Sequence, residues 1–329
     1  MDAAVTTTTL PAVELDGLTH AYGGRVALDS LSLEVRRGEL FALLGPNGSG
    51  KTTLFRILST LMAPSGSGRV RVCGADAVAD PAAVRRRIGV VFQAPSLDRK
   101  LTARENLVHQ GHLYGLAGGD LRGRIERALE AVGMTRRADE RVERLSGGMQ
   151  RRIEVAKALL HDPDLLLLDE PSTGLDPGAR RDLRDELTAL RDRRGVTCLL
   201  TTHLMDEADT CDRVAILDHG RLAALGTPAE LKAAVGGEVV TLDTPDPPVL
   251  ARSVSERLGL CATVVGPAVR IEVCADAARP AARLLIDIVE AFPGLVTAAR
   301  VGRPSLEDAF IHFTGHRFYD DPTETEGVA

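Results

Sequence analysis

Lysine, long apolar runs and paired cysteines are scarce or missing in this chain of 329 residues. Lysine occurs only at positions 51, 100, 157 and 232, although Lys and Arg together number 40. A coding bias toward GC-rich codons explains this preference for Arg without any role in phosphate binding. We therefore expect Lys51 to be a position that requires an ammonium group.

The cysteines exclude two classes of small scaffold. They are scattered along the chain, with no C-x-x-C pair, at Cys73, Cys198, Cys211, Cys261 and Cys274. Such an odd and scattered set is typical neither of a disulfide framework nor of a zinc site. We predict that all are small buried residues in a protein of a reducing compartment.

No apolar run approaches the length of about eighteen residues that a membrane-spanning helix needs. The longest runs, residues 40–44 and 165–168, have the length of strands. Residues 1–10 carry neither the basic start nor the apolar stretch of a secretory signal peptide. We therefore expect the chain to stay in the cytoplasm and to reach a membrane only through another protein.

Charge and composition are those of an ordinary globular protein. The net charge of -6 gives no electrostatic reason to expect nucleic acid as a partner. Apolar residues make up 44% and charged residues 26% of the chain, which is typical of soluble domains. The length predicts about two domains.

Short apolar strands alternate with helices through most of the chain. The strand patterns cover residues 40–44, 89–92, 165–168, 198–201 and 214–217. Their alternation with helical patterns predicts an α/β domain with a mainly parallel sheet over residues 12–236. Residues 98–160 have helical periodicity and are predicted to form a helical subdomain within it.

Residues 238–316 carry a second pattern, in which the predicted elements are strand, helix, strand, strand, helix and strand. This βαββαβ order is typical of a small ferredoxin-like α+β domain. The two ends of the chain show no such pattern. Residues 1–11 are predicted to be disordered, and residues 317–329 to form a flexible acidic tail.

Residues 45–52 match the phosphate-loop pattern G-x-x-x-x-G-K-[ST] between a predicted strand and a predicted helix. The glycines allow backbone N–H groups to turn toward phosphate oxygens, and the helix start adds a positive dipole. Lys51 is expected to reach the β- and γ-phosphates, and Thr52 to ligate Mg²⁺. The predicted phosphate-binding residues are Gly45, Pro46, Asn47, Gly48, Ser49, Gly50, Lys51, Thr52 and Thr53. The pattern alone predicts a nucleoside triphosphate site and does not separate a transporter from a GTPase, a kinase or a repair ATPase.

Two acids, Asp169 and Glu170, end the apolar strand at residues 165–168. Such a strand delivers its carboxylates to the sheet edge where ligands bind in open α/β folds. Asp169 is expected to hold Mg²⁺, and Glu170 to orient and deprotonate the attacking water. His203 and Gln93 each come just after another predicted strand of the sheet. His203 can therefore reach the γ-phosphate, and Gln93 can touch Mg²⁺ or the water. Alone, the acid pair is about as often an ordinary charged turn, His203 is more often a surface or core residue, and Gln93 is a weak signal. Together with the phosphate loop they favour the catalytic interpretation.

A second glycine-rich turn, Ser146, Gly147 and Gly148, precedes a helix predicted at residues 151–160. It is either simple capping of that helix by Ser146 or a second anion site at the positive end of the helix. The second glycine favours the anion site, because capping alone does not need it. Two anion sites far apart in one chain predict that ATP is clamped between two subunits.

These segments, in this order, closely resemble the ATPase subunits of ABC transporters over residues 12–236. The matching features are the Walker A loop at residues 45–52, the Q-loop at Gln93, the LSGGQ signature at residues 145–150, Walker B at residues 165–170, the D-loop at residues 174–176, and the switch histidine at His203. Tyr22 is placed like the aromatic residue that stacks on adenine. Met149 departs from the signature, which has Gln there, but the usual Ser and backbone contacts precede it.

The resemblance implies a P-loop NTPase core of ABC type that uses ATP and Mg²⁺. Two subunits, either two copies of this chain or one copy and a paired ATPase, would join head to tail around two ATPs. The turn at residues 146–148 of one subunit would close on the γ-phosphate bound by Lys51 of the other, and Asp176 of the D-loop would lie among the nucleotide-binding residues. Hydrolysis would reopen the pair and drive a membrane partner docked near residues 93–105. The implied catalytic residues are Glu170, His203, Gln93 and Lys51, and the implied metal ligands are Thr52, Gln93 and Asp169.

Three further segments resemble the daunorubicin/doxorubicin-resistance type of ATPase, which serves ABC-2 exporters. They are residues 96–98, residues 218–221 with 226–231, and residues 304–310 with 314–315. The resemblance implies a peripheral protein on the cytoplasmic face of the membrane. It would power export of a drug-like, lipid or glycan substrate through a separate ABC-2 type permease.

Three alternatives stay open at this point. A non-transport ABC ATPase of translation or DNA repair has two cassettes or a long coiled coil, whereas this chain has one cassette and no sustained heptads. An import ATPase commonly carries a β-rich accessory barrel, whereas residues 238–316 have a mixed pattern. An ATP-gated regulatory module without turnover is disfavoured by Glu170 and His203. The sequence identifies neither the substrate nor the permease, and it leaves open a homodimer or a heterodimer and the role of residues 238–316.

Overall fold

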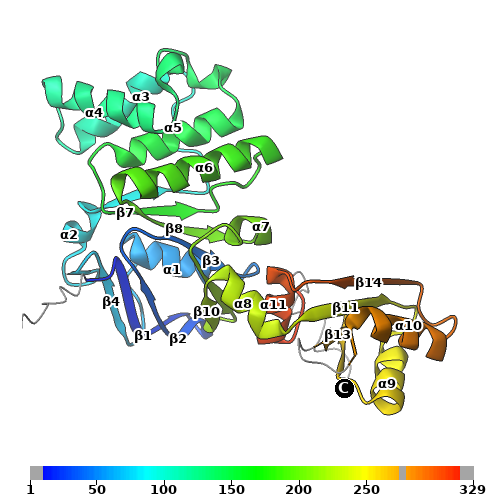
Figure 1. Cartoon of the computed structure of the whole chain (residues 1–329). Helices are drawn as coiled ribbons and strands as arrows, with labels where there is room; N and C mark the ends of the chain where they lie inside the picture. Colours follow the sequence, from blue (N-terminus) through cyan, green and yellow to red (C-terminus); the bar gives the residue numbers. More distant parts are fainter. Residues whose placement is uncertain (1–9, 274–278, 319–329) are drawn as a thin grey trace, which may run out of the picture. The chain divides into compact units, whose positions relative to one another are not determined.

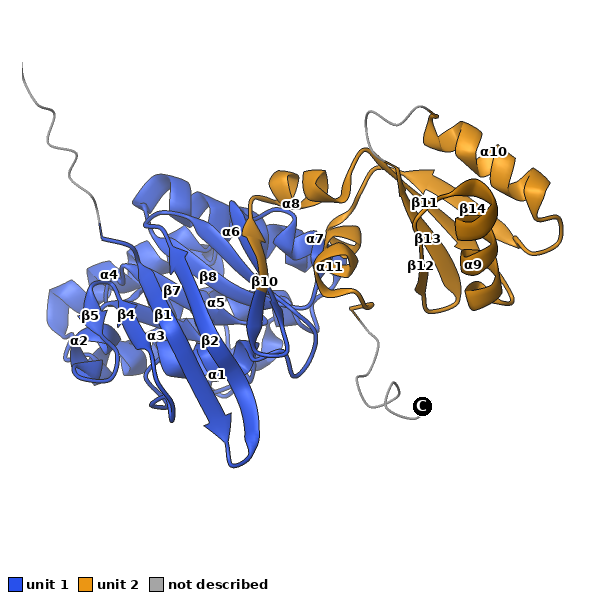
Figure 2. Cartoon of the chain, turned by 90° about the horizontal axis from the view of Figure 1, so that it is seen from below, with its two compact units in different colours: residues 1–222 blue, residues 223–329 orange. Residues whose placement is uncertain are grey.

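The computed structural model describes residues 10–273 and 279–318. Most of the predicted disordered start, most of the predicted acidic tail and Cys274 lie outside the described residues. The chain divides into two compact units, Met1–Leu222 and Ala223–Ala329, which Figure 2 draws in blue and orange. None of the helices in the described ranges combines the length and apolar character needed to cross a bilayer.

The first unit is built on a six-stranded sheet (Figure 1), whose edge strand β10 belongs mostly to the second unit. Its order is β10 (Arg221–Gly226), β9 (Arg213–Asp218), β3 (Leu40–Leu44), β8 (Thr197–Thr202), β7 (Leu165–Asp169) and β6 (Ile88–Val91). Strand β3 pairs in parallel with β8 and β9, and β7 pairs in parallel with β6 and β8. All residues of β3 and β7 are buried, as expected for strands covered on both faces. The predicted α/β class with a mainly parallel sheet is confirmed.

The first unit also contains a second, antiparallel sheet. The sequence pattern did not distinguish this sheet from the parallel one. Its order is β2 (Arg25–Val35), β1 (Val13–Tyr22), β4 (Arg69–Val72) and β5 (Ala75–Asp76). Helix α1 (Lys51–Leu58) packs against β2 on one side and against β7 and β8 on the other. It therefore lies between the two sheets, as Figure 1 shows. The short helix α2 (Pro81–Arg85) packs near β5 and β6.

The helices of residues 98–160 gather at one end of the unit (Figure 1). They are α3 (Ala103–Leu113), α4 (Gly118–Ala131) and α5 (Gly147–Leu159), with the short turns η1 (Thr135–Arg137) and η2 (Val142–Arg144). Helix α6 (Pro177–Arg194) packs on α5 and on strands β3 and β8, and α7 (Met205–Ala208) follows β8. The start of α5 differs most from the prediction: the helix begins at Gly147 instead of residue 151, because Ser146 caps it and the glycines form its first turn.

The second unit contains α8 (Pro228–Val235) and α11 (Leu306–Thr314), which pack together, and a four-stranded sheet. The chain divides after Leu222, and both α8 and α11 lie in the second unit. The elements between these helices are β11 (Glu238–Asp243), α9 (Pro247–Leu258), β12 (Ala262–Val265), β13 (Ala268–Val273), α10 (Ala281–Ala291) and β14 (Ala298–Gly302). The strands pair antiparallel in the order β12-β13-β11-β14.

The apolar core of the second unit lies between this sheet and helices α9 and α10. Val240, Val254 and Ile288 are among its fully buried side chains. The cysteine prediction is corrected here: Cys73, Cys198 and Cys211 are buried, but Cys261, at the turn after α9, is exposed. The turn puts its side chain outside that core.

Candidate active site

The phosphate loop connects the buried strand β3 to helix α1 and depends on its glycines. Gly48 and Gly50 have φ angles of 80° and 102°, in the left-handed region that favours glycine. A Cβ on Gly50 would lie 2.6 Å from the Ala27 carbonyl oxygen, and a Cβ on Gly45 would lie 2.5 Å from the Leu217 carbonyl oxygen. The curve of this loop therefore has no room for side chains at these positions.

Lys51 is the first residue of α1 and is buried. Its ammonium donates to the carbonyl oxygens of Gly45 at 2.6 Å and Pro46 at 2.8 Å, which uses two of its three donors. Burial lowers the pKa of Lys51 to about 8, and the negative charges of Glu170 and Asp169 oppose that shift. The charge of Lys51 is thus held close to the carboxylate pair, in a place where an anion would stabilise it.

The rest of the loop also fits a bound polyphosphate. The Ser49 hydroxyl is buried and has no hydrogen-bond partner among the described residues, a costly state that a phosphate oxygen would relieve. Thr52 is exposed in the first turn of α1, whereas Thr53 is buried. The first turn of a helix has N–H groups without intrahelical acceptors, and they contribute the positive end of the helix dipole. The residues predicted for phosphate binding thus lie together.

Asp169 ends strand β7, next to Thr201 on β8. Its Oδ1 accepts a hydrogen bond of 2.7 Å from the Thr201 hydroxyl. Burial raises the pKa of Asp169, the Thr201 hydrogen bond opposes this shift, and the Glu170 charge adds to it. A desolvated carboxylate of this kind is stabilised by a divalent cation, so Asp169 fits the predicted role of Mg²⁺ ligand.

The side chains of Gln93 and His203, both predicted to be catalytic, lie beside the Glu170 carboxylate. Its Oε2 accepts hydrogen bonds of 3.1 Å from the Gln93 amide and 3.1 Å from the Thr173 hydroxyl. Its Oε1 lies 3.3 Å from Nδ1 of His203. Because β6, β7 and β8 are adjacent parallel strands, their carboxyl ends bring these three segments to one edge of the sheet.

The backbone of Glu170 is strained and held in place. Its φ of 43° is in the left-handed region, which is unfavourable for a residue with a side chain. Its N–H donates to the Thr201 hydroxyl at 3.0 Å and to the Thr201 carbonyl at 3.2 Å. The end of β8 therefore fixes the direction in which the Glu170 carboxylate leaves β7.

The turn at Ser146, Gly147 and Gly148 has a structural explanation as well as the predicted functional one. The Ser146 hydroxyl accepts a hydrogen bond of 3.3 Å from the N–H of Met149 and caps α5. A Cβ on Gly148 would lie 2.7 Å from the Ala179 Cβ, so the second glycine allows the close approach of α5 and α6. Among the described residues, the hydrogen bonds of this turn do not reach the phosphate loop of the same chain.

Two further predicted residues lie apart from the carboxylates. The Asp176 carboxylate caps α6 by accepting hydrogen bonds from the N–H groups of Gly178 at 2.9 Å and Ala179 at 3.0 Å. The bond from Ala179 is the main cause of the lowered pKa of Asp176. Tyr22 is exposed on β1, where its hydroxyl donates to Met62 Sδ at 3.3 Å. Their contacts with a nucleotide stay predictions.

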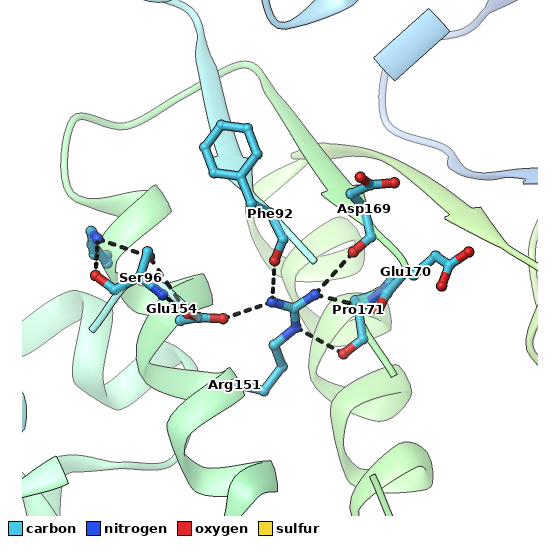
Figure 3. Close-up of polar contacts among 8 residues, drawn as sticks. Phe92, Ser96, Arg151, Glu154, Asp169, Glu170 and Pro171 are labelled. Atoms are coloured by element: carbon cyan, nitrogen blue, oxygen red, sulfur yellow. Dashed lines mark hydrogen bonds and ion pairs between the residues drawn. The ribbon is translucent and has the colours of Figure 1, made fainter. Parts of the chain in front are cut away.

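Sequence reasoning missed three residues of this site, Thr173, Thr201 and Arg151. Thr173 follows Glu170 by three residues and donates its hydroxyl to that carboxylate. Thr201 holds both acids because the register of β7 and β8 sets it opposite Asp169. Arg151, on α5, donates to backbone carbonyls of the segments that carry Gln93 and Glu170 (Figure 3). No pattern in the sequence gives the strand register, and a single Arg in a helix rich in Arg carries no signal.

Comparison with known proteins relates this arrangement to one family. The family model described as ABC transporter matches residues 28–173. The daunorubicin/doxorubicin resistance ATP-binding protein DrrA of Streptomyces peucetius is 40% identical over 317 residues, which cover 95% of each chain. The Nod factor export ATP-binding protein I of Sinorhizobium fredii is 40% identical over 318 residues, which cover 94% of this chain and 88% of that protein.

Solved structures agree with the sequence relatives. The cbiO1 protein of Clostridium perfringens, part of the ABC transporter complex cbiONQ, has a TM-score of 0.64 and 29% identity, covering 76% of this chain and 96% of that one. The ATP-binding cassette MJ0796, in a dimeric post-hydrolysis state bound to ADP and Pi, has a TM-score of 0.58 and 29% identity. The match covers 65% of this chain and 98% of that one. In that second structure the nucleotide-bound form is a dimer.

Proposed function

This chain belongs to the ABC transporter family of ATP-binding proteins, and we propose that it hydrolyses ATP to drive export through a separate ABC-2 type permease. As a member of the family it is an ATPase subunit. Relatives named for drug resistance and for Nod factor export make it the ATPase subunit of an exporter. The permease type is our inference from those relatives and from the three sequence segments described above.

The observation that carries the catalytic assignment is the convergence of Gln93, Glu170 and His203 beside Lys51. Lys51 would neutralise charge on the β- and γ-phosphates, as the phosphate loop holds them. Glu170 would orient the attacking water and accept its proton, with Gln93 and Thr173 holding the carboxylate in place. His203, next to Glu170, would contact the γ-phosphate.

The donor set also fits Mg²⁺, the usual companion of bound ATP. Thr52, Gln93 and Asp169 would hold it, through a hydroxyl, an amide oxygen and a carboxylate, all oxygen ligands of the kind that Mg²⁺ prefers. The ion supplies charge neutralisation to the β- and γ-phosphates. The raised pKa of buried Asp169 supports this role, because a cation favours its ionised form.

A second ATPase subunit is part of the proposal. The turn at Ser146, Gly147 and Gly148 makes no hydrogen bond to its own phosphate loop within the described residues, yet it lies at the positive end of α5. We propose that it closes on the nucleotide of a partner subunit, where the exposed Asp176 would also lie. The dimeric MJ0796 cassette bound to ADP and Pi supports such a pairing.

The transported substrate is proposed only by class. Relatives named for resistance to daunorubicin and doxorubicin and for Nod factor export favour a drug-like, lipid or glycan substrate. Cargo selection would lie in the permease, which would hold this chain at the cytoplasmic face of the membrane. The segment at residues 93–105, which is mostly exposed from residue 93 to residue 100, would contact the permease.

One experiment tests both partners. Two copies of the chain with different tags are expressed together in the native host, and one tag is purified from detergent-solubilised membranes. We expect the eluate to contain a multi-helix permease and, with ATP added to the Glu170→Gln form, the second tag. Ribosomal or DNA-repair proteins without any membrane protein would refute the transport proposal. A permease with a different ATPase in place of the second tag would refute a homodimer and support a paired subunit.

A further inference from the structure

Arg151 is a buried cation whose hydrogen bonds converge on the active site. It lies in the second turn of α5 and is 7% exposed. Its Nε donates to the Pro171 carbonyl at 2.8 Å, and its Nη1 to the Phe92 carbonyl at 2.6 Å. Its Nη2 donates to the carbonyls of Asp169 at 3.1 Å and Glu170 at 3.4 Å. One guanidinium thus binds the backbone just before Gln93 and around both acids (Figure 3).

Glu154, one turn further along α5, extends the same network. Its Oε2 lies 2.6 Å from Nη1 of Arg151, and its Oε1 accepts a hydrogen bond of 2.7 Å from the N–H of Ser96. Lys157 donates to the Ser96 carbonyl and hydroxyl, each at 3.0 Å. Through these contacts one face of α5 holds both ends of residues 92–96, the segment that contains Gln93.

The orientation of this network favours a role in catalysis over one in packing alone. A buried ion pair contributes little net stability, because the desolvation of two charges offsets their attraction. Figure 3 shows the carboxylates of Asp169 and Glu170 pointing away from the Arg151 guanidinium, while their backbone carbonyls point toward it. Arg151 therefore holds the strained backbone at Glu170 and leaves both carboxylates free for chemistry.

We propose that Arg151 and Glu154 are positioning residues for ATP hydrolysis. Together they fix the backbone beside Gln93 and Glu170, so that the amide and the carboxylate keep the geometry in which Glu170 acts on water. The inference rests on the proposed roles of those two residues. It requires the planar five-donor fork of Arg, which a lysine with the same charge cannot reproduce.

The test is Arg151→Lys in the purified full chain. We expect kcat to fall by about 10-fold to 100-fold, the effect of a small misplacement of reacting groups, while the ATP Kd stays unchanged. The matched control is Arg152→Lys, the next residue of the same helix, whose side chain pairs with Asp182 at 2.6 Å and Glu186 at 3.0 Å instead. Control turnover should equal that of the wild type. Undiminished kcat in Arg151→Lys would overturn the proposal.

A double variant separates positioning from general loss of structure. If Arg151 acts through Glu170, Arg151→Lys added to Glu170→Gln lowers the residual turnover no further, because the positioned group is already gone. Losses that multiply while ATP binding stays intact would assign the positioning effect to Gln93 and not to Glu170. A parallel loss of ATP binding would show a structural role and refute the inference. Undiminished turnover in Glu170→Gln alone would instead refute the proposed function of Glu170.

A charge-free pair keeps the test decisive if Arg151→Lys does not fold. The double substitution Arg151→Met with Glu154→Leu removes both charges together and leaves no unpaired buried ion. We expect it to melt cooperatively, to bind ATP like the wild type, and to show the same reduction in kcat. A folded double variant with wild-type turnover would overturn the proposal.

Discussion

The phosphate loop and the carboxylate cluster (Gln93, Asp169, Glu170 and His203) are assembled in opposite ways. The loop is an unbroken run, residues 45–53, whose shape follows from its own glycines. The cluster comes from the ends of three strands, spread over more than a hundred residues of chain, and is held by contacts between them. Nucleotide binding can thus be specified locally, whereas the chemistry depends on strand register.

The two regions also differ in how their polar atoms are satisfied. In the loop, the buried Ser49 hydroxyl has no partner in the described part of the chain, which suits a site waiting for phosphate oxygens. In the cluster, the Glu170 carboxylate already accepts hydrogen bonds from Gln93 and Thr173. The loop is therefore expected to control affinity, and the cluster to control turnover.

The largest expected effect is on turnover through the cluster. Glu170→Gln keeps the shape of the side chain but removes the base, so kcat should fall by about 10²–10⁴-fold. ATP binding should be retained, because the loop is untouched. Phosphate release and nucleotide Kd, measured on the same preparation, check both halves of this statement. A loss of ATP affinity as large as the loss of kcat would show that the cluster controls binding as well as turnover.

The complementary change is Lys51→Ala in the loop. It removes the ammonium that faces the phosphates, and hydrogen bonds to charged groups are worth about 1.5–3 kcal/mol, or roughly 10- to 100-fold in ATP Kd. Binding is measured by titration calorimetry in the Glu170→Gln background, where hydrolysis does not interfere. Lys232→Ala, in the second unit, is the control and should bind like its parent. Unchanged affinity in Lys51→Ala would remove the lysine from the binding site.

A smaller effect, on pH dependence, sharpens the role of Lys51. Burial lowers its pKa from 10.5 to about 8, so the ammonium loses its proton as the pH rises through that value. Since ATP binds the charged form, Kd should weaken by about tenfold between about pH 7 and about pH 9. Titrations across this range should show the slope in the wild type and a flat response in Lys51→Ala. The same slope in both proteins would assign it to another group.

Several elements could be predicted from sequence because their signals are local. Strands β3 and β7 are short apolar runs ended by a glycine or by acids, and the start of α6 follows from Asp176 and Pro177. The separate antiparallel sheet of β1, β2, β4 and β5 was not predicted. Strands β1 and β2, and strands β4 and β5, pair as neighbours in the chain, but the pairing of β1 with β4 that joins them into one sheet links distant segments. The early start of α5 was missed because glycines are poor helix formers, and the cap overrides that preference.

The sequence by itself determined the residues of the phosphate loop, the acids at the end of β7 and the α/β class, since each depends on neighbours in the chain. Only the tertiary structure decided that Thr201 holds both acids, that Gln93 and His203 meet at Glu170, and that Arg151 joins their segments. The physical reason is that these contacts arise from the order and register of parallel strands and from one helix packed across their ends. Hydrogen bonds between such distant segments leave no periodicity or spacing in the sequence.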